Sequence, residues 1–266
     1  MPIAGWLLAF TDYKPGKLFS QLNWVGLKNF KLILFYWSDV SNAIKNTLIF
    51  TAAYLITGLL PILFAVALNE VRSPRLKKFI QTSSTLPNFV GWVIVYALAY
   101  ALFSSFGMVD TVLMDIGLTS EPLMLLARSE CAKPFQIALS IWKSLGWSAI
   151  IYIAAIAGID QQLYEAAAVD GAGRFRRMWH ITIPGILPTY LVVLLLGIGN
   201  MLKVGFEQYY IFSNSVTRSS LEVVDVFTYR IGIQSQDYTF ATAISILGSM
   251  ISILLLTFAN GAAKRI

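Results

Sequence analysis

Long apolar runs alternate with shorter polar segments along the chain, and the lengths of these runs indicate the class of fold. A helix that crosses a membrane needs about 20 predominantly apolar residues. Five runs come near or exceed this length, separated by segments rich in charges, glycines or prolines. We therefore predict five full transmembrane helices. Their expected bounds are residues 46–69, 86–106, 134–159, 186–212 and 238–262.

The first 45 residues form a different pattern. Residues 1–10 are apolar, but ten helical residues span only about 15 Å of a hydrocarbon core of about 30 Å. They carry neither a basic leader nor a small-residue cleavage site, so we do not interpret them as a signal peptide. We expect the outer half of a truncated first helix. Residues 11–45 mix charges with aromatic residues, which is typical of an external segment at the membrane interface.

Composition supports an all-α integral membrane protein. The chain is 57% hydrophobic and only 13% charged, whereas about 25% charged residues is usual for soluble domains. Neither a repeat nor a low-complexity linker divides it, so we predict one transmembrane domain over residues 46–262 and a short tail at 263–266. The net charge of +6 bears on membrane topology, and we expect no nucleic-acid partner.

Candidate chemistry is sparse. Cys131 and His180 are the only residues of their types, which is too few ligands for a metal site of the His/Cys type. The sequence contains no Ser-His-Asp arrangement, Walker loop or dinucleotide fingerprint. We therefore predict that the chain is not an enzyme and binds no cofactor of its own. Any energy that drives this protein must therefore come from a partner or an ion gradient.

The distribution of basic residues predicts the orientation. Lysine and arginine are dense, with few acids, in the short segments 72–78 and 160–184 and at the C-terminus. On the other side nine acidic residues balance the basic ones. Because short basic loops stay inside, we expect these three segments to be cytoplasmic.

The segment 160–184 is a polar, basic island between two apolar runs. Its small residues and glycines favour a helix, a sharp turn and a second short helix. We expect Asp170 to cap the second helix, Gly171 and Gly173 to form the turn, and Pro184 to end the second helix. Ala166 and Ala167 expose little side chain, so a partner surface could approach the backbone closely.

A longer pattern runs through this segment: Glu-Ala-Ala, three residues, Gly, nine residues, then Ile-x-apolar-Pro. It resembles the cytoplasmic coupling loop of ATP-binding-cassette importer permeases. The alternative is an ordinary cytoplasmic helix-turn-helix between two spans. The matching positions are Glu165, Ala166, Ala167, Gly171, Ile181, Ile183 and Pro184.

Other stretches are similar to the carbohydrate branch of these permeases and extend the resemblance over most of the chain. They comprise residues 24–30, 46–48, 142–156, 205–208 and 226–230. The resemblance implies a type I importer fold in a bacterial cytoplasmic membrane, although members of this branch usually have six spans. It also implies a second similar permease, two ATPase subunits that hold ATP and magnesium, and an external solute-binding protein. The residues implied in ATPase coupling are Glu165, Ala166, Ala167, Asp170, Gly171, Phe175, Trp179 and Pro184.

Polar residues within the predicted spans suggest a substrate path. A lysine at the centre of a span costs about 2.5–3.5 kcal/mol on insertion scales, so it should face a partner or a watery cavity. Asn200, Lys203 and Glu207 fall on one helical face with aromatic residues nearby, which suits sugars. Alternatively, Lys203 and Glu207 neutralise each other, or the lysines reach the membrane surface. The candidate path residues are Lys143, Trp147, Asn200, Lys203, Glu207 and Gln208.

Two further expectations concern packing and substrate. Ala154 and Gly158 form a small-xxx-small pair that could support close helix packing. Lys143 and Lys203 make the expected path cationic, so we hypothesise acidic oligosaccharides as substrates. An ATP-driven importer for another small solute remains an alternative, and so does a gradient-driven transporter that uses the intramembrane charges.

Overall fold

The structure is a computed structural model that describes residues 5–18, 21–105, 107–199 and 205–263. Every regular element in these ranges is a helix, and Thr11 and Trp24 form an isolated β-bridge. The chain folds as two compact units. Met1–Ala52, Trp92–Gln136 and Ile198–Ala262 form unit 1, and Ala53–Gly91, Ile137–Gly197 and Ala263–Ile266 form unit 2.

Four helical stretches are long and apolar enough to cross a membrane among the described residues: Trp37–Asn69, Trp92–Asp115, Ser129–Ala157 and Arg174–Gly199. The apolar stretch Tyr238–Leu254 is shorter and lies within α15 (Tyr238–Ala263). The predicted membrane protein is thus confirmed. The count of five full spans and a truncated one stays a prediction.

Unit 1 packs an N-terminal segment against the C-terminal helices. Its core consists of buried apolar residues from η1 (Leu7–Phe10), α2 (Lys28–Phe35), α3 (Trp37–Thr57), α14 (Val224–Tyr229) and α15. The remaining helices of this unit are α6 (Trp92–Phe103), α7 (Met108–Asp115), η4 (Leu125–Ala127), α12 (Phe206–Phe212), α13 (Arg218–Leu221) and the π-helical turn η7 (Arg230–Gln234).

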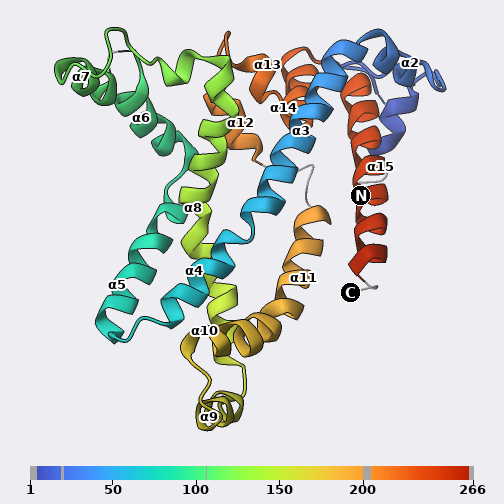
Figure 1. Ribbon diagram of the computed structural model, residues 1–266. Helices are drawn as coiled ribbons and strands as arrows, with labels where there is room; N and C mark the ends of the chain where they lie inside the picture. Colours follow the sequence, from blue (N-terminus) through green and yellow to red (C-terminus); the bar gives the residue numbers. More distant parts are fainter. Residues whose placement is uncertain (1–4, 19–20, 106, 200–204, 264–266) are drawn as a thin grey trace. The chain divides into compact units, whose positions relative to one another are not determined.

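Unit 2 contains the segment predicted to couple to an ATPase. Its core joins α4 (Leu60–Asn69), α8 (Ser129–Ala157) and α11 (Ile183–Gly199) through residues such as Ala65, Tyr152 and Ile186. Figure 1 shows α9 and α10 in the connection between α8 and α11. The other elements are α5 (Pro74–Thr85), η3 (Leu86–Phe89), α9 (Gln161–Val169), α10 (Arg174–Arg177) and the π-helical turn η5 (Met178–Thr182).

Several predicted boundaries are wrong. Helix α3 begins at Trp37, nine residues before the expected start at 46. A helix can include polar residues on one face, so it can begin before the apolar run does. The helical stretch Trp37–Asn69 is interrupted just before Pro61, since α3 ends at Thr57 and α4 begins at Leu60. The predicted basic loop 72–78 is mostly helix, because Ser73 caps α5 by accepting from the Leu76 N–H at 3.4 Å.

Candidate functional site

Helix α9 carries the Glu-Ala-Ala pattern and is capped at both ends. At its start, Asp160 Oδ1 accepts from the Gln162 N–H at 2.9 Å. At its end, Gly171 adopts φ +74°, and the Ala172 N–H donates to the Ala167 carbonyl at 2.8 Å. The Gly171 N–H donates to the Ala168 carbonyl at 3.1 Å. These two bonds are a Schellman motif, in which a left-handed glycine ends the helix sharply.

This motif confirms the turn predicted at Gly171 and corrects the role of Asp170. Asp170 is the C-cap of α9, and its backbone N–H donates to Ala166. The residue before α10 is Gly173, and no side chain caps that helix. Gly173 has φ −68° and ψ 170°, an extended conformation open to any residue. The acidic residue lies one position before the glycine that ends α9, so it cannot also begin α10.

Pro184 does not end the second helix as predicted. The chain stays helical from Arg174 through the π turn η5 into α11, where Pro184 is the second residue. Proline lacks an N–H and clashes with the preceding turn of an α-helix. The wider π turn immediately before it accommodates both effects, and such local adjustments are how membrane helices tolerate proline. One helical stretch therefore connects the loop to a membrane span.

The loop exposes large apolar side chains. Val169 is 88% exposed, Phe175 is 82% exposed and Trp179 is 65% exposed. Glu165 and Ala166 are also exposed, and Ala167 is half-buried. Exposed apolar patches of this kind mark sites of protein–protein or membrane interaction.

Internal contacts hold the base of the loop. The Tyr164 hydroxyl and Thr182 Oγ1 lie 2.9 Å apart, which joins α9 to η5. Arg174 Nε lies 4.0 Å from Glu70 Oε2 at the end of α4. The exposed loop is thus anchored by contacts with residues of the same unit.

Lys143 and Trp147 lie on α8 in unit 2, and both contact the segment that follows α5. Lys143 Nζ donates to the carbonyl oxygens of Pro87 at 3.3 Å, Asn88 at 2.7 Å and Val90 at 2.6 Å. The Trp147 ring meets the Phe89 ring edge-on at 5.6 Å. The ammonium group thus lies among backbone carbonyls where the helical segment ends, and the Pro87 carbonyl also accepts from the Val90 N–H at 3.2 Å.

Close helix packing occurs beside Lys143 and not at the predicted small-xxx-small pair. A Cβ on Gly146 would overlap the backbone carbonyl of Ser84 in α5. At Gly158, among the described residues, a Cβ would meet only the carbonyls of Ala154 and Ala155 at ordinary contact distance. Gly158 follows the last residue of α8 and meets no other described helix closely, and packing of the pair onto a second subunit stays a prediction.

The expected polar face of residues 200–207 is only partly described. Asn200 and Lys203 lie outside the described residues. Glu207 is exposed in α12, and Gly205, the residue before that helix, has φ +74°. The predicted i, i+3, i+7 face of residues 200, 203 and 207 therefore stays a prediction. Gln208 is buried, and its Nε2 donates to Gln136 at 2.8 Å (Oε1) and 2.9 Å (backbone O).

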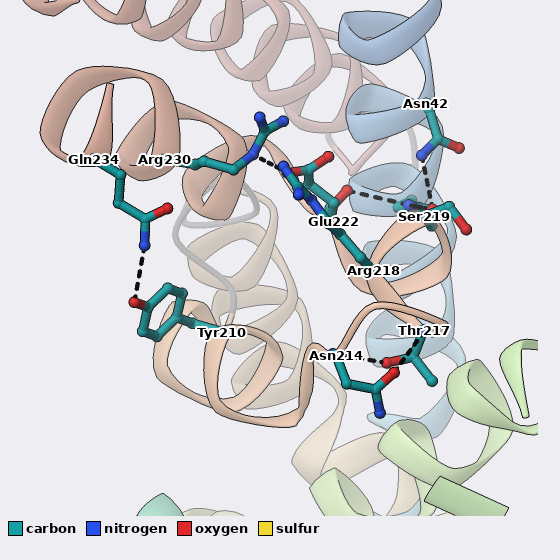
Figure 2. A network of polar contacts seen from close by, with 10 residues as sticks. Asn42, Tyr210, Asn214, Thr217, Arg218, Ser219, Glu222, Arg230 and Gln234 are labelled. Atoms are coloured by element: carbon teal, nitrogen blue, oxygen red, sulfur yellow. Dashed lines mark hydrogen bonds and ion pairs between the residues drawn. The ribbon is translucent and has the colours of Figure 1, made fainter. Parts of the chain in front are cut away.

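Three aromatic rings of unit 1 gather beside these residues. Phe206 stacks on Tyr210 at 5.5 Å, and Tyr229 meets the two rings edge-on at 5.1 and 5.2 Å. Gln234 Nε2 donates to the Tyr210 hydroxyl at 3.1 Å (Figure 2). We call Phe206, Tyr210 and Tyr229 the aromatic triad. Its stacked pair has the i, i+4 spacing that a helix predicts; no local pattern indicated Gln234.

Tyr209 lies between Phe206 and Tyr210 in the sequence but is not part of the triad. It is buried and stacks on Phe50 of α3 at 4.3 Å. A one-residue step on a helix rotates the side chain by about 100°, so neighbours in sequence face different surroundings.

A second polar cluster fixes the backbone near the triad (Figure 2). Glu222 Oε1 lies 2.7 Å from Arg230 Nε and 3.6 Å from Arg218 Nε. Asn46 Nδ2 donates to the carbonyls of Ser219 at 2.8 Å and Glu222 at 3.1 Å. Asn46 is polar although it stands at the predicted start of a span, because its side chain holds the turn that leads into α14.

A cleft in the same unit combines aromatic and hydroxyl groups. It has a volume of about 460 Å³ and lies between α6, the end of α12 and η4. The Tyr96 ring meets the Phe212 ring edge-on at 5.0 Å. Sequence patterns did not indicate this cleft, because its lining comes from three separate segments. Its polar and aromatic lining includes Tyr96, Tyr100, Phe103, Ser104, Ser105 and Asn214.

The coupling loop and the membrane spans find a match among known proteins. The family model for the inner membrane component of binding-protein-dependent transport systems matches residues 57–266. The chain belongs to this family. The resemblance to permeases is therefore confirmed, and with it the identification as a membrane-embedded permease subunit, which is not an enzyme.

Two relatives come from Bacillus subtilis (strain 168). Protein LplB is 40% identical over 267 residues, covering 100% of this chain and 83% of the relative. The polygalacturonan/rhamnogalacturonan transport system permease protein YteP is 39% identical over 267 residues, covering 100% of this chain and 82% of the relative.

A solved structure shows the type I permease fold. A crystal structure of a bacterial ABC transporter involved in the import of the acidic polysaccharide alginate matches with a TM-score of 0.90 and 36% identity, covering 100% of this chain and 89% of that chain. A second structure, of the alginate transporter in complex with an alginate pentasaccharide-bound periplasmic protein, matches with a TM-score of 0.89 and 35% identity, covering 99% of this chain and 88% of that chain.

Proposed function

We propose that this permease is one half of the translocation path of an ATP-driven importer for oligosaccharides, with a preference for acidic ones. The observation that carries the proposal is the joint similarity to YteP and to the alginate importer. Polygalacturonan and alginate are both polyuronates, and the two relatives match essentially the whole chain. A shared substrate class is the simplest consequence of that joint similarity.

The proposed assembly adds a second permease, two ATPase subunits and an external solute-binding protein. The complex of the alginate transporter with a loaded periplasmic protein supports the last partner. ATP would bind to the ATPase subunits and not to this chain. The segment 160–184 and the C-terminus would face the cytoplasm, consistent with their basic residues.

The coupling residues have distinct proposed roles. Glu165 makes a charged contact with an ATPase subunit, and the small side chains of Ala166 and Ala167 permit close approach. Phe175 and Trp179 insert into apolar notches, as their exposure allows. Asp170 and Gly171 end α9 at the required angle, and Pro184 lies where the loop joins α11. Closure of the ATPase subunits then switches the path between two bistable arrangements.

For the substrate path, the aromatic triad is the best supported contact surface. Sugar rings pack their C–H faces on aromatic rings, and the Tyr210 hydroxyl and Gln234 supply hydrogen-bonding groups beside them. Glu207, the residue after Phe206, is exposed. In contrast, Gln208 is hydrogen-bonded to Gln136, and Lys143 donates to backbone carbonyls. We therefore assign Gln208, Lys143 and Trp147 supporting positions along the path, with Asn200 and Lys203 still candidates for contact.

Import of another small solute is the second candidate. It is favoured by relatives such as the osmoprotective compounds uptake permease protein GgtC of Synechocystis, which is 32% identical over 221 residues and covers 78% of this chain. A gradient-driven transporter is disfavoured by the family, and by the position of Lys143 against three carbonyl oxygens.

The substrate class is tested in proteoliposomes that contain the full complex and its binding protein. Uptake of a labelled uronate oligosaccharide should be inhibited by unlabelled uronate and not by a neutral oligosaccharide of equal length. Tyr210→Leu should lower uptake by about tenfold, and Tyr210→Phe, which keeps the ring, should lower it far less. Equal competition by acidic and neutral sugars would overturn the acidic preference.

A further inference from the structure

A cavity of about 540 Å³ lies at the base of the coupling loop, wholly within unit 2. It is bounded by the end of α4 and the residues after it, by the end of α8, by the first turn of α9 and by α10. The lining comes from four separate segments of the chain, so the cavity is a feature of the fold and not of a single loop.

Arginine dominates the charge of this cavity. Arg72 reaches it from the α4–α5 connection, and Arg174 and Arg177 reach it from α10. Glu70 is the one acidic residue in the described lining, and it lies 4.0 Å from Arg174. Both partners of this pair are about half-exposed, so water weakens their attraction. The lining therefore carries a net charge of about +2 toward a ligand.

The cavity also lies where three candidate membrane spans end. Trp37–Asn69 and Ser129–Ala157 end at it, and Arg174–Gly199 begins at it. The ends of apolar spans lie at the membrane–water interface, the level of phospholipid headgroups. Apolar groups of Met178 and Ala157 share the lining with the arginines. An occupant with a negative head and an apolar continuation would match both parts.

We propose that this cavity binds the phosphate of an anionic phospholipid headgroup. Guanidinium groups match phosphate oxygens in geometry and charge, and basic pockets between spans bind such headgroups. Because Arg72 and Arg177 come from separate segments, one bound phosphate would connect the α4–α5 connection to α10. The lipid would thereby steady the base of the coupling loop.

Lipid retention during native mass spectrometry tests the proposal on the purified complex. The complex is prepared in nanodiscs of phosphatidylcholine with a minor fraction of phosphatidylglycerol. The parent should retain phosphatidylglycerol. Each arginine near the surface is worth about fivefold in affinity, so Arg72→Gln/Arg177→Gln should lower retention by about thirtyfold. The matched control is Arg75→Gln/Arg176→Gln, which removes the same charge from α5 and α10 but does not line the cavity.

Three results would overturn the proposal. The double variant and the control could retain lipid equally, which would mean that only general positive charge matters. Inorganic phosphate at millimolar concentration could displace the phosphatidylglycerol fully, which would mean a site for free phosphate. The double variant could lose the ATPase subunits while it keeps its lipid, which would assign the cavity to an acidic protein partner. None of these readouts requires sugar transport.

Discussion

The coupling loop and the segment 206–234 use polar and aromatic residues in opposite ways. In the loop, Phe175 and Trp179 are largely exposed, and Glu165 points away from the core of its unit into solvent. In the segment 206–234, Glu222 is paired with arginine and Gln208 is bonded to Gln136.

This contrast distinguishes two kinds of unusual residue. A side chain that is costly to expose and remains exposed indicates a partner outside the chain. A side chain that is costly to bury and has found its hydrogen bonds indicates a structural role. We therefore expect substitutions in the loop to affect assembly and coupling, and substitutions in the polar cluster to affect folding stability.

The largest effect should come from Phe175→Ala/Trp179→Ala. Aromatic anchors at interfaces are each worth about 2 kcal/mol or more, which is about thirtyfold in affinity for each residue. Affinity of the permease for the ATPase subunits, measured by co-purification at graded concentrations, should fall sharply while thermal stability stays the same. Phe79→Ala removes an exposed aromatic residue of α5 and serves as the control. Unchanged affinity of the double variant for the ATPase subunits would contradict the proposal that Phe175 and Trp179 contact these subunits.

Glu222→Ala should be the most destabilising change in the polar cluster. The Arg230 side chain is only 25% exposed, and the substitution removes the carboxylate that pairs with it. Loss of one member of such a pair costs about 3 kcal/mol. Unfolding of the purified permease in detergent should show this loss. Glu121→Ala, at an exposed position, should show little change. Normal stability combined with lost transport would mean that Glu222 acts in the substrate path and not in folding stability.

Lys143→Met tests a residue whose role is open between structure and substrate. Three carbonyl oxygens would lose their charged donor, at a cost of about 2 kcal/mol. We expect a lower unfolding temperature and an unchanged KM for substrate, with partial rescue by Lys143→Arg. A raised KM with normal stability would mean that Lys143 contacts the substrate.

Asp12→Asn should give the smallest effect. The Lys17 ammonium at 2.8 Å, together with Asn23, holds the pKa of the Asp12 carboxyl well below its usual value of 3.8. A carboxyl with a lowered pKa stabilises the fold above pH 3.8, and the contribution is lost as the pH falls further. Hydrogen exchange of residues 8–25 should therefore differ between parent and variant at pH 7 and converge in acid. A difference that grows below pH 4 would contradict this assignment.

The sequence predicted the fold class and the turn at Gly171 well, because both depend on local patterns. Apolar run length gave the membrane class, and Gly171 forms the turn that its residue type favours. The predictions that failed depended on backbone features that residue type alone does not show. Pro184 continues a helix because a π turn precedes it, and Asp170 is the C-cap of α9 because Gly171 ends that helix.

The substrate path could be predicted only in outline. Periodicity placed Glu207 on a face with residues 200 and 203, which lie outside the described residues, so that face stays a prediction. Phe206 and Tyr210 were visible at i, i+4, whereas Tyr229 and Gln234 join them through the tertiary fold. Buried amides such as Gln208 resemble ligand contacts in sequence, because the pattern does not show their partners.

The central claim is that the loop transmits ATP hydrolysis to the path, and Glu165→Arg tests it most directly. ATPase activity of the reconstituted complex is measured with and without the loaded solute-binding protein. We predict stimulation in the parent, loss of stimulation in Glu165→Arg, and retention in the control Glu121→Arg. If the permease binds no ATPase subunit, or if Glu165→Arg is stimulated like the parent, the account of the coupling loop is contradicted.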